Sequence, residues 1–280
     1  MATALSRSLL FAVQSLPLPR IANIGFFMPT PRHAFRRILL TLAILLPGNS
    51  YAQSDAAADF GKKGWGGSAE TALRLKAHWF YNWGPKGESR PGLEFVPMVK
   101  SKGQVTPEIL GAIKASGAKV LLGFNEPERR DQGNTSVAEA LDLWSKLMET
   151  GLRLGSPAPS SDNGGMAWLD EFMKGVEKRK LRVDFIAVHW YRSANPQEFE
   201  NWLRDLHRKY RRPVWVTEFD AQYSGGDRDR FAAQSFKFLD HLRDVERYAY
   251  FTTGPGQPGS LWKAGGEKEL SPLGEDCVKH

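Results

Sequence analysis

The stretch Gly123-Phe124-Asn125-Glu126-Pro127-Glu128 follows a short apolar run, residues 119–122, and places a carboxylate where a predicted buried strand ends. Far downstream, Pro213-Val214-Trp215-Val216-Thr217-Glu218-Phe219 has the same design, because β-branched and aromatic residues lead to a glutamate. If both strands belong to one parallel barrel, their carboxyl ends meet at the same face. Glu126 and Glu218 would then lie across the barrel mouth from each other, as hydrolysis of a glycosidic bond requires.

Outward from these two strand ends, short apolar runs alternate with amphipathic helical windows, which is typical of a parallel α/β fold. The predicted strands are residues 63–66, 76–82, 94–99, 119–124, 152–156, 184–190, 214–218 and 247–252. Eight such units within residues 62–280 predict a single, compact (β/α)8 TIM barrel. An open doubly wound sheet is the alternative, but no glycine-rich phosphate-binding motif follows any of these strands.

Helix signals separate the predicted strands. Thr106 and Pro107 have the residue types of a helix cap and first helical position, and Gly117 is a typical helix end. Apolar residues at three- and four-residue spacing predict further helices within residues 138–148, 199–210 and 231–242. Trp144 and Trp202 lie on these apolar stripes, and we therefore assign them to the core.

The first 52 residues have the order of a signal peptide. Arg36-Arg37 precede the apolar run 38–46, and Ser50-Tyr51-Ala52 provides small residues for cleavage. The run is too short to span a bilayer comfortably, so we expect cleavage after Ala52 and no stable membrane insertion afterwards. Met28 is the expected true start. We expect residues 53–61 to form a flexible tether, residues 62–280 the catalytic domain, and the protein to be secreted or periplasmic.

The charge of the chain gives little support to a nucleic-acid partner. The formal net charge is +7, but residues 1–52 contain five Arg and no acidic residue. The remainder therefore holds 33 basic and 31 acidic residues, which is a near balance. With Cys277 as the only cysteine, the chain has no internal disulfide and no cysteine-rich metal site.

The sequence lacks the motifs of metal-dependent and serine-nucleophile active sites. His78 and His189 match no H-E-x-x-H pattern with the glutamates, and no G-x-S-x-G sequence is present. We therefore expect neither a metal nor an organic cofactor. Either glutamate alone could be an exposed or helix-capping carboxylate. The occurrence of both glutamates at the ends of predicted strands favours catalysis.

The two carboxylates allow two mechanisms. A separation of about 5 Å suits a nucleophile and an acid/base in a retaining reaction, whereas more than about 6.5 Å leaves room for water and inversion. Strict alternation along the seventh strand would place Val214, Val216 and Glu218 on the face that lines the barrel. It would also place Trp215 on the opposite face, under a helix.

Aromatic and polar side chains are frequent at the predicted strand ends. Aromatic rings suit the C–H faces of sugars, and amide and imidazole groups suit their hydroxyls, although core packing is the alternative for each aromatic residue. The residues expected to bind substrate on this basis are His78, Trp79, Asn82, Trp83, Trp168, Trp190 and Trp262.

The ordered set of motifs resembles glycoside hydrolase family 128, the β-1,3-glucanases of clan A. The resemblance rests on Trp79-Phe80-Tyr81-Asn82-Trp83, Phe95-Val96-Pro97-Met98, Leu122-Gly123-Phe124-Asn125-Glu126-Pro127, Gly155-Ser156-Pro157-Ala158, Asp184-Phe185-Ile186-Ala187-Val188-His189-Trp190-Tyr191 and Val216-Thr217-Glu218-Phe219. The match runs in order from about Lys62 to Trp262. Asn-Glu-Pro alone occurs in many clan A enzymes, so the specificity comes from the full set.

This resemblance implies a retaining hydrolase of β-1,3-glucan, which we expect to be endo-acting and monomeric. By resemblance, Glu126 is the acid/base and Glu218 the nucleophile. Asn125 would bond the substrate 2-hydroxyl, while His189 and Tyr191 would line the same subsite.

Two features depart from the family pattern: Glu128 replaces the usual Asp, and the first strand is Lys63-Gly64-Trp65-Gly66-Gly67, which would alter the cleft lining. Two alternatives remain, a β-glucan-binding protein without catalysis and a clan A glycosidase of another linkage specificity. The presence of two strand-end glutamates argues against a binding protein.

Overall fold

The computed structural model describes residues 61–280 of the chain. The predicted leader, its Met28 start and all of the predicted tether except Gly61 lie outside the described residues. The strands are β1 (Lys63–Gly66), β2 (Trp79–Tyr81), β3 (Glu94–Phe95), β4 (Val120–Leu121), β5 (Arg153–Leu154), β6 (Ile186–Trp190), β7 (Val214–Phe219) and β8 (Val245–Tyr250). Each predicted strand is present, although several are shorter than expected.

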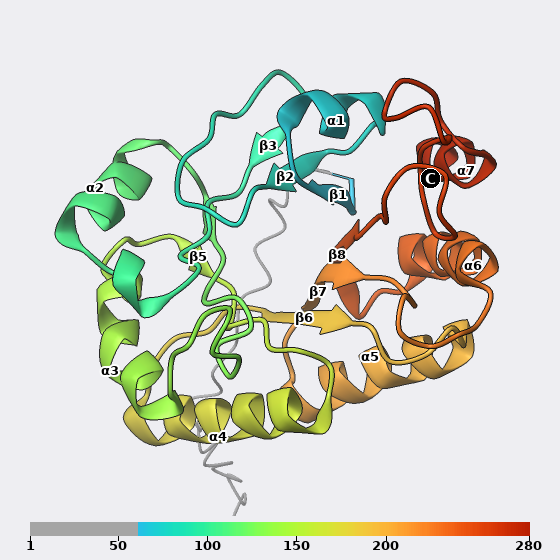
Figure 1. Ribbon diagram of the computed structural model, residues 1–280. Helices are drawn as coiled ribbons and strands as arrows, with labels where there is room; N and C mark the ends of the chain where they lie inside the picture. The colour runs from blue at the N-terminus through green and yellow to red at the C-terminus, as the bar shows by residue number, and fades with distance from the viewer. Residues whose placement is uncertain (1–60) are drawn as a thin grey trace, which may run out of the picture. The chain divides into compact units, whose positions relative to one another are not determined.

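Helices alternate with these strands and lie outside them (Figure 1). The helices are α1 (Ala69–Arg74), the 3-10 turn η1 (Lys102–Gln104), α2 (Pro107–Ala115), α3 (Val137–Met148), α4 (Asn163–Arg179), α5 (Pro196–Tyr210), α6 (Arg228–His241) and α7 (Pro272–Lys279). The predicted start of α2 is confirmed, because the Thr106 side chain accepts a hydrogen bond from the Ile109 amide. Gly117 follows the helix with a φ of +77°, as predicted for a helix end.

The strands close into a ring. Six parallel strands are hydrogen-bonded in the order β3-β2-β1-β8-β7-β6, and β4 pairs with β5. Single parallel bridges join the two groups, Met98 with Leu122 on one side and Gly155 with Phe185 on the other. Together these pairings form the predicted (β/α)8 barrel rather than an open doubly wound sheet.

Two hydrophobic cores result from this closure. The outer core lies between strands and helices, and includes the predicted helix residue Trp144. The inner core fills the barrel and has members from almost every strand or its immediate extension. Its buried members are Trp79, Tyr81, Val96, Met98, Val120, Leu122, Ala158, Phe185, Ala187, Trp215 and Ala249. The barrel interior is therefore packed, and any cleft must lie at its mouth.

The glycine-rich first strand makes room for aromatic residues of β2. A Cβ atom on Gly64 would lie 2.0 Å from the Trp79 ring, and one on Gly66 would lie 3.1 Å from the Trp83 ring. Side chains at these two positions of β1 would therefore displace the neighbouring indoles. The unusual composition of this strand follows from the size of its neighbours.

A β-bulge interrupts β7 immediately before its glutamate. Val216 pairs with Val188, and the next pair along the two strands is Glu218 with His189. Thr217 is thus an extra residue in β7, and it shifts the faces of all residues that follow. The pairing of β7 with β8 is irregular over the same segment.

The bulge corrects our prediction of which residues of β7 face inward. Trp215 packs in the inner core, whereas Val214 and Val216 pack in the outer core, which is the reverse of the expected pattern. If Thr217 were paired as a regular residue instead of bulged, strict alternation from Trp215 would turn Glu218 toward the helices. The prediction that Glu218 lies at the mouth is correct, but its stated reason was wrong.

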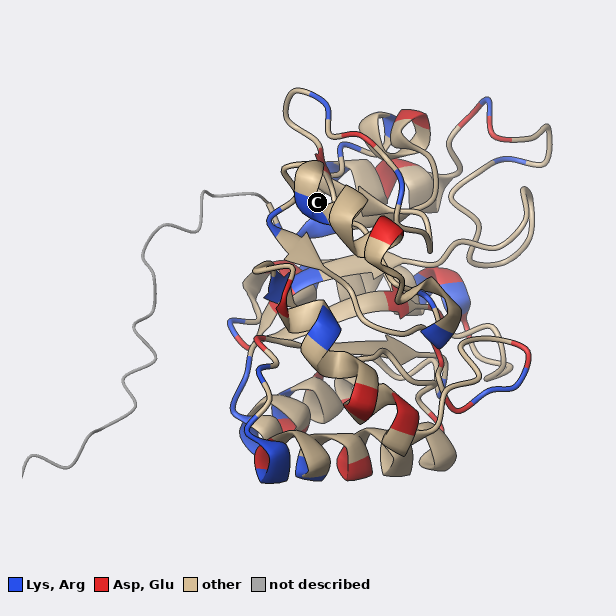
Figure 2. Ribbon diagram, turned by 90° about the vertical axis from the view of Figure 1, so that its left-hand side faces the viewer, with Lys and Arg blue, Asp and Glu red and all other residues tan. Residues whose placement is uncertain are grey.

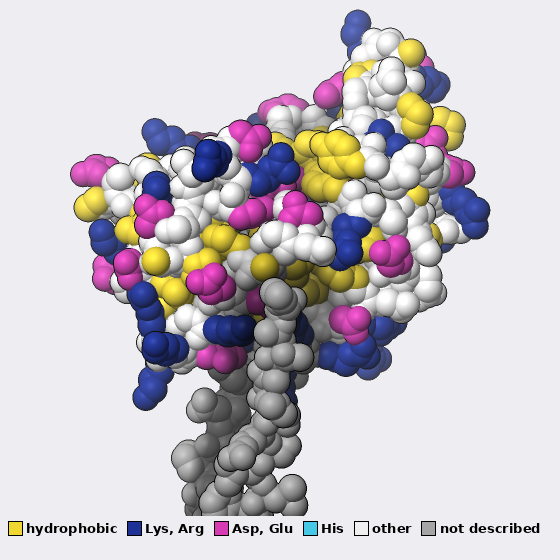
Figure 3. Space-filling view, turned by 60° about the horizontal axis from the view of Figure 1, so that its bottom comes forward, with side chains coloured by type: hydrophobic (Ala, Val, Ile, Leu, Met, Phe, Trp, Pro, Cys, Tyr) yellow, Lys and Arg dark blue, Asp and Glu magenta, His cyan; other side chains and the backbone are white. Residues whose placement is uncertain are grey.

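The described surface has no dominant charge. Lys, Arg, Asp and Glu alternate along the helices in Figure 2, and both signs are interspersed on the face shown in Figure 3. None of the described helices is both long enough and apolar enough to cross a membrane.

Candidate active site

Three side chains from three strand ends meet at the carboxyl face of the barrel. Glu126 follows β4, His189 is in β6 and Glu218 is in β7. His189 Nδ1 lies 3.3 Å from Glu126 Oε1, and His189 Nε2 lies 3.5 Å from Glu218 Oε1. The imidazole is fully buried, and the side chains of Glu126 and Glu218 are only 12% and 9% exposed. One imidazole ring therefore lies between the two carboxylates.

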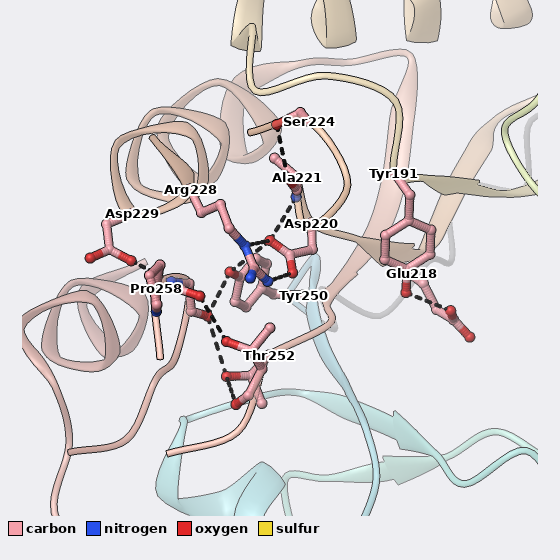
Figure 4. A network of polar contacts seen from close by, with 12 residues as sticks. Tyr191, Glu218, Asp220, Ala221, Ser224, Arg228, Asp229, Tyr250, Thr252 and Pro258 are labelled. Carbon is pink, nitrogen blue, oxygen red and sulfur yellow. Dashed lines mark hydrogen bonds and ion pairs between the residues drawn. The ribbon is translucent and has the colours of Figure 1, made fainter. Parts of the chain in front are cut away.

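Glu218 is held by aromatic hydrogen-bond donors on both of its oxygens. The Trp83 indole donates to Oε1 at 2.7 Å, and the Tyr191 hydroxyl donates to Oε2 at 2.8 Å. Figure 4 shows Tyr191 pointing at this carboxylate. The Tyr81 hydroxyl lies 3.3 Å from Oε1 and 2.9 Å from the carbonyl oxygen of Thr217. These donors fix the orientation of the Glu218 carboxylate, because each of its oxygens accepts at least one hydrogen bond.

The two phenols remain protonated. Burial, and next the nearby charge of Glu218, raises the pKa of Tyr81 and of Tyr191 well above the usual value for a phenol. Both hydroxyls therefore keep the proton that they donate throughout the ordinary pH range.

Glu126 lies in a strained but well-bonded turn. Its φ is +38°, in the left-handed region that residues with a side chain seldom adopt. Its amide donates to the carbonyl of Ala158, and its own carbonyl accepts from the amides of Arg129 and Gly133. Pro127 follows directly, as the sequence requires, and its carbonyl accepts from Thr135. The backbone is thus fixed on both sides of the carboxylate.

The polar neighbours of Glu126 differ from those of Glu218. Arg129 Nε lies 3.6 Å from Glu126 Oε2, but its side chain is 47% exposed and also lies near Asp131. Solvent screens such a pair, so its contribution is small. Among residues 61–280, Glu126 has no aromatic donor beyond His189 of the kind that holds Glu218.

Two further polar groups lie beside Glu126 in sequence. Asn125 is buried, and its Oδ1 atom has no hydrogen-bond partner among the described residues. Glu128 Oε1 accepts from the Ser160 amide, which ties the segment after β4 to the segment after β5. Since buried polar atoms are normally paired, the Asn125 amide is suited to contact a ligand.

Burial and the neighbouring carboxylates act in opposite directions on the pKa of His189. Burial alone would lower the pKa of the imidazole, but the charge of Glu218 and the hydrogen bond and charge of Glu126 together outweigh burial and raise it. The imidazolium form is therefore favoured, and it can hold both carboxylates in place.

Four aromatic rings form a strip along the Glu218 side of the site, and we call it the aromatic arc: Trp83, Phe251, Tyr191 and Tyr223. Adjacent ring centroids are 6.2 Å, 5.9 Å and 6.0 Å apart in that order. The sequence prediction included Trp83 and Tyr191 but missed Phe251 and Tyr223. Phe251 follows β8 at the same parity as the interior residue Ala249, a signal that could have identified it.

Two residues predicted to bind substrate lie at the wrong end of the barrel. The His78 amide donates to Lys63 O at the start of β1, so His78 lies near the amino ends of the strands. Trp79 is completely buried in the inner core, and its indole donates to Lys62 O at 3.0 Å. Neither side chain therefore lies with the two glutamates.

Four further residues predicted to bind substrate take part in packing or in a local turn. Trp168 lies on α4, is stacked on Phe172 and donates to Thr135 O. Trp190 is completely buried in the outer core, and Trp262 is 1% exposed. Asn82 is exposed, and its amide instead donates to Lys86 O within its own loop.

No group of three or more His, Cys, Asp or Glu side chains with the arrangement of a metal site was found within residues 61–280.

A (β/α)8 barrel with two carboxylates at the carboxyl ends of different strands is the arrangement of a glycoside hydrolase. Residues 62–276 match the family described as glycosyl hydrolase catalytic core. A GH128 (subgroup I) endo-β-1,3-glucanase from Amycolatopsis mediterranei, solved with laminaritriose, is 33% identical with a TM-score of 0.68. The alignment covers 78% of this chain and 98% of that enzyme. The chain therefore belongs to glycoside hydrolase family 128.

Other solved structures show the same relationship. A GH128 (subgroup II) endo-β-1,3-glucanase from Sorangium cellulosum is 28% identical, with a TM-score of 0.66 and coverage of 78% and 97%. A curdlan-specific exo-β-1,3-glucanase of subgroup III from Blastomyces gilchristii is 30% identical, with a TM-score of 0.65 and coverage of 78% and 98%. The Amycolatopsis enzyme was also crystallised with laminari-oligosaccharides after either of two different glutamates was replaced by alanine. None of the curated proteins compared with the chain matches it.

Proposed function

We propose that this protein is a retaining, endo-acting hydrolase of β-1,3-glucan. The observation that carries the proposal is the placement of Glu126 and Glu218 on either side of His189 at one end of the barrel. The substrate class is supported by the GH128 structures solved with laminari-oligosaccharides, and endo action by the endo-glucanases among them.

The surroundings of the two carboxylates support different roles. A nucleophile must be ionised, and Glu218 accepts strong hydrogen bonds from Trp83 and Tyr191. An acid/base must gain and lose a proton during the cycle, so it needs fewer fixed donors. Glu126, with an exposed arginine and one imidazole nearby, suits this second role.

In the first step, Glu126 gives its proton to the oxygen of the scissile glycosidic bond while a Glu218 oxygen attacks the anomeric carbon. The bond between that carbon and the leaving oxygen breaks, and a glycosyl ester forms on Glu218. In the second step, ionised Glu126 takes a proton from water, whose oxygen attacks the same carbon and releases Glu218. Two inversions at one carbon give net retention.

The groups around the reacting atoms would orient the sugar. Asn125 carries a buried oxygen without a partner in the part of the chain that the structure describes, and it lies next to the proposed acid/base, which suits it to a substrate hydroxyl. Trp83 and Tyr191 present half-buried rings beside the nucleophile, so they can contact the sugar while they hold the carboxylate. His189 would position both carboxylates rather than react.

The stereochemistry of the product tests the mechanism. Laminarihexaose is hydrolysed by the wild-type protein in an NMR tube, and the anomeric proton signals are followed before mutarotation. We expect the β-anomer to appear first. Initial formation of the α-anomer would reject retention, and no release of reducing ends from laminarin would reject the enzyme in favour of a binding protein.

The product profile tests endo action separately. An endo-acting enzyme produces a mixture of oligosaccharides early in the digestion of linear β-1,3-glucan. Chromatography that shows only one short product from the first minutes onward would indicate attack at chain ends.

Export and monomeric state are further parts of the proposal. The order of basic, apolar and small residues before Gln53 supports cleavage after Ala52 and a secreted or periplasmic location. N-terminal sequencing of exported protein tests the cleavage site, and light scattering of the mature protein tests the monomer.

A further inference from the structure

Tyr223 is an exposed aromatic residue in an otherwise well-packed domain. Within residues 61–280, the large hydrophobic side chains that remain exposed are Leu73, at 44%, and Tyr223, at 78%. Leu73 lies on α1, whereas Tyr223 lies in the loop between β7 and α6, five residues after Glu218. An aromatic ring left in water this close to an active site requires an explanation.

The loop that carries Tyr223 has a defined structure. The Ser224 amide and hydroxyl both bond to the carbonyl of Ala221, and the Gly226 amide donates to Ser224 Oγ. The base of the loop is anchored by Asp220, which accepts from the Ala221 amide and from the guanidinium of Arg228 (Figure 4). Tyr223 is therefore exposed because a closed turn presents it to solvent.

The loop also packs tightly against the neighbouring loop after β6. A Cβ atom on Gly226 would lie only 2.5 Å from the Cβ atom of Ala194. This close approach holds the two loops together, and Tyr191 and Tyr223 project from them as neighbours. Their ring centroids are 6.0 Å apart at an interplanar angle of 61°.

Tyr223 is the outer end of the aromatic arc. The arc begins at Trp83, passes through Phe251 and Tyr191, and ends at Tyr223. Trp83 and Tyr191 donate hydrogen bonds to the carboxylate of Glu218, whereas Tyr223 joins the arc through its contact with the Tyr191 ring. A bound sugar at Tyr223 would consequently lie beyond the sugar that reacts.

We propose that Tyr223 is a binding residue of an outer subsite, where its ring stacks on the C–H face of a glucose unit next to or beyond the reacting one. This inference rests on the proposed function. Aromatic rings provide a large apolar area with little conformational freedom to lose, so one exposed ring can add useful affinity. Tyr223 would thereby favour long glucan chains over short ones.

Isothermal titration calorimetry with laminarihexaose tests the subsite in protein that cannot turn over its ligand. Glu218→Gln is the common background, and Tyr223→Ala, Tyr223→Phe and Leu73→Ala are each added to it. We expect Tyr223→Ala to weaken binding about tenfold, because a stacking contact is lost. Tyr223→Phe retains the ring and should bind within about twofold of the background. Leu73→Ala, which removes the other exposed apolar side chain, should change nothing.

Kinetics on laminarihexaose provide a second measurement with the active enzyme. We expect Tyr223→Ala to raise KM by about tenfold with a much smaller change in kcat, since the ring contacts sugar away from the reacting bond. Unchanged binding and unchanged KM in Tyr223→Ala would overturn the subsite, as would a Tyr223→Phe protein as weak as the alanine variant. Failure of the Glu218→Gln background itself to bind laminarihexaose would instead reject the substrate class, and the subsite with it.

Discussion

The two glutamates of the site are similarly buried but have different neighbours. Both lie within about 3.5 Å of His189, and their side chains are nearly equally inaccessible. Glu218 receives hydrogen bonds from an indole and a phenol, whereas Glu126 lies in a strained turn beside an exposed arginine. The comparison teaches that the hydrogen-bond donors around each carboxylate, rather than its burial, distinguish the proposed nucleophile from the proposed acid/base.

The largest expected effect concerns Glu218. Glu218→Gln removes the proposed nucleophile and should lower kcat on laminarin by about 10⁴-fold or more. The measurement is release of reducing ends, with thermal unfolding as the check on folding. Glu171→Gln, at an exposed position of α4, is the matched control and should retain full activity. Activity within tenfold of the wild type would contradict the assignment of Glu218.

Glu126 should have the next largest effect, and the effect should depend on the leaving group. Glu126→Ala removes the proton donor, so laminarin hydrolysis should fall by about 10²- to 10⁴-fold. A β-laminaribioside with a dinitrophenol leaving group needs no protonation to depart and should suffer much less in its first step. Azide should restore turnover and give a β-glycosyl azide. An α-azide, or equal losses on both substrates, would remove the distinction between the two glutamates.

A smaller effect is expected when a single donor to Glu218 is lost. Tyr191→Phe removes one hydrogen bond to a charged acceptor, worth about 1.5–3 kcal/mol, so kcat/KM should fall by about 10- to 100-fold.

Tyr210→Phe provides the control for that experiment. Tyr210 donates to Asp170 Oδ1 at 2.6 Å and therefore makes the same kind of bond on the helical side of the fold. Its substitution should affect stability but leave kcat/KM and the pH profile intact. Equal kinetic losses in the two variants would mean that Tyr191 acts through stability.

The smallest expected effect is on stability, through His189. Its pKa is raised in the folded protein, so its contribution to the free energy of unfolding is complete below the unfolded pKa of about 6.5. The contribution is lost as the pH rises through the folded pKa, by about 1.4 kcal/mol for each unit of the shift. Urea denaturation of wild type and His189→Gln between pH 6 and 9 measures it. A difference between the two proteins that does not shrink as pH rises would contradict the prediction.

The fold was predictable because parallel barrels leave a strong sequence pattern. All eight apolar runs form strands, and the cap at Thr106 and the stop at Gly117 lie where predicted. Strand lengths were less predictable, since short strands in this barrel continue as extended segments with single bridges. Sequence periodicity detects the extended segment but not where regular hydrogen bonding ends.

The site was predictable only in part. Glu126, His189, Glu218, Trp83 and Tyr191 do come together, because each lies at or just beyond the carboxyl end of a strand. Whether each of the other aromatic side chains lies at the site or in a core depends on which face of a strand or helix it occupies.

The face that an aromatic residue occupies depends on neighbouring small residues, on helix boundaries and on loop hydrogen bonds, which leave weak signals in the sequence. Trp79 points into the inner core in space that Gly64 leaves free, and Trp168 belongs to α4, a helix that the sequence analysis did not predict. Tyr223 was missed because its loop follows no periodic pattern, and its exposure depends on hydrogen bonds within that loop.

The bulge at Thr217 divides β7 into a part that packs the two cores and a part that carries the glutamate, and the alternation of faces restarts between them. Deletion of this one residue would make Val216 and Glu218 adjacent, so regular alternation would still turn Val216 toward the helices and Glu218 toward the mouth. Thr217 paired as a regular residue would instead turn Glu218 toward the helices, with no change in sequence. The position of the carboxylate therefore depends on how β6 and β7 pair, and an alignment that shows only the glutamate does not record it.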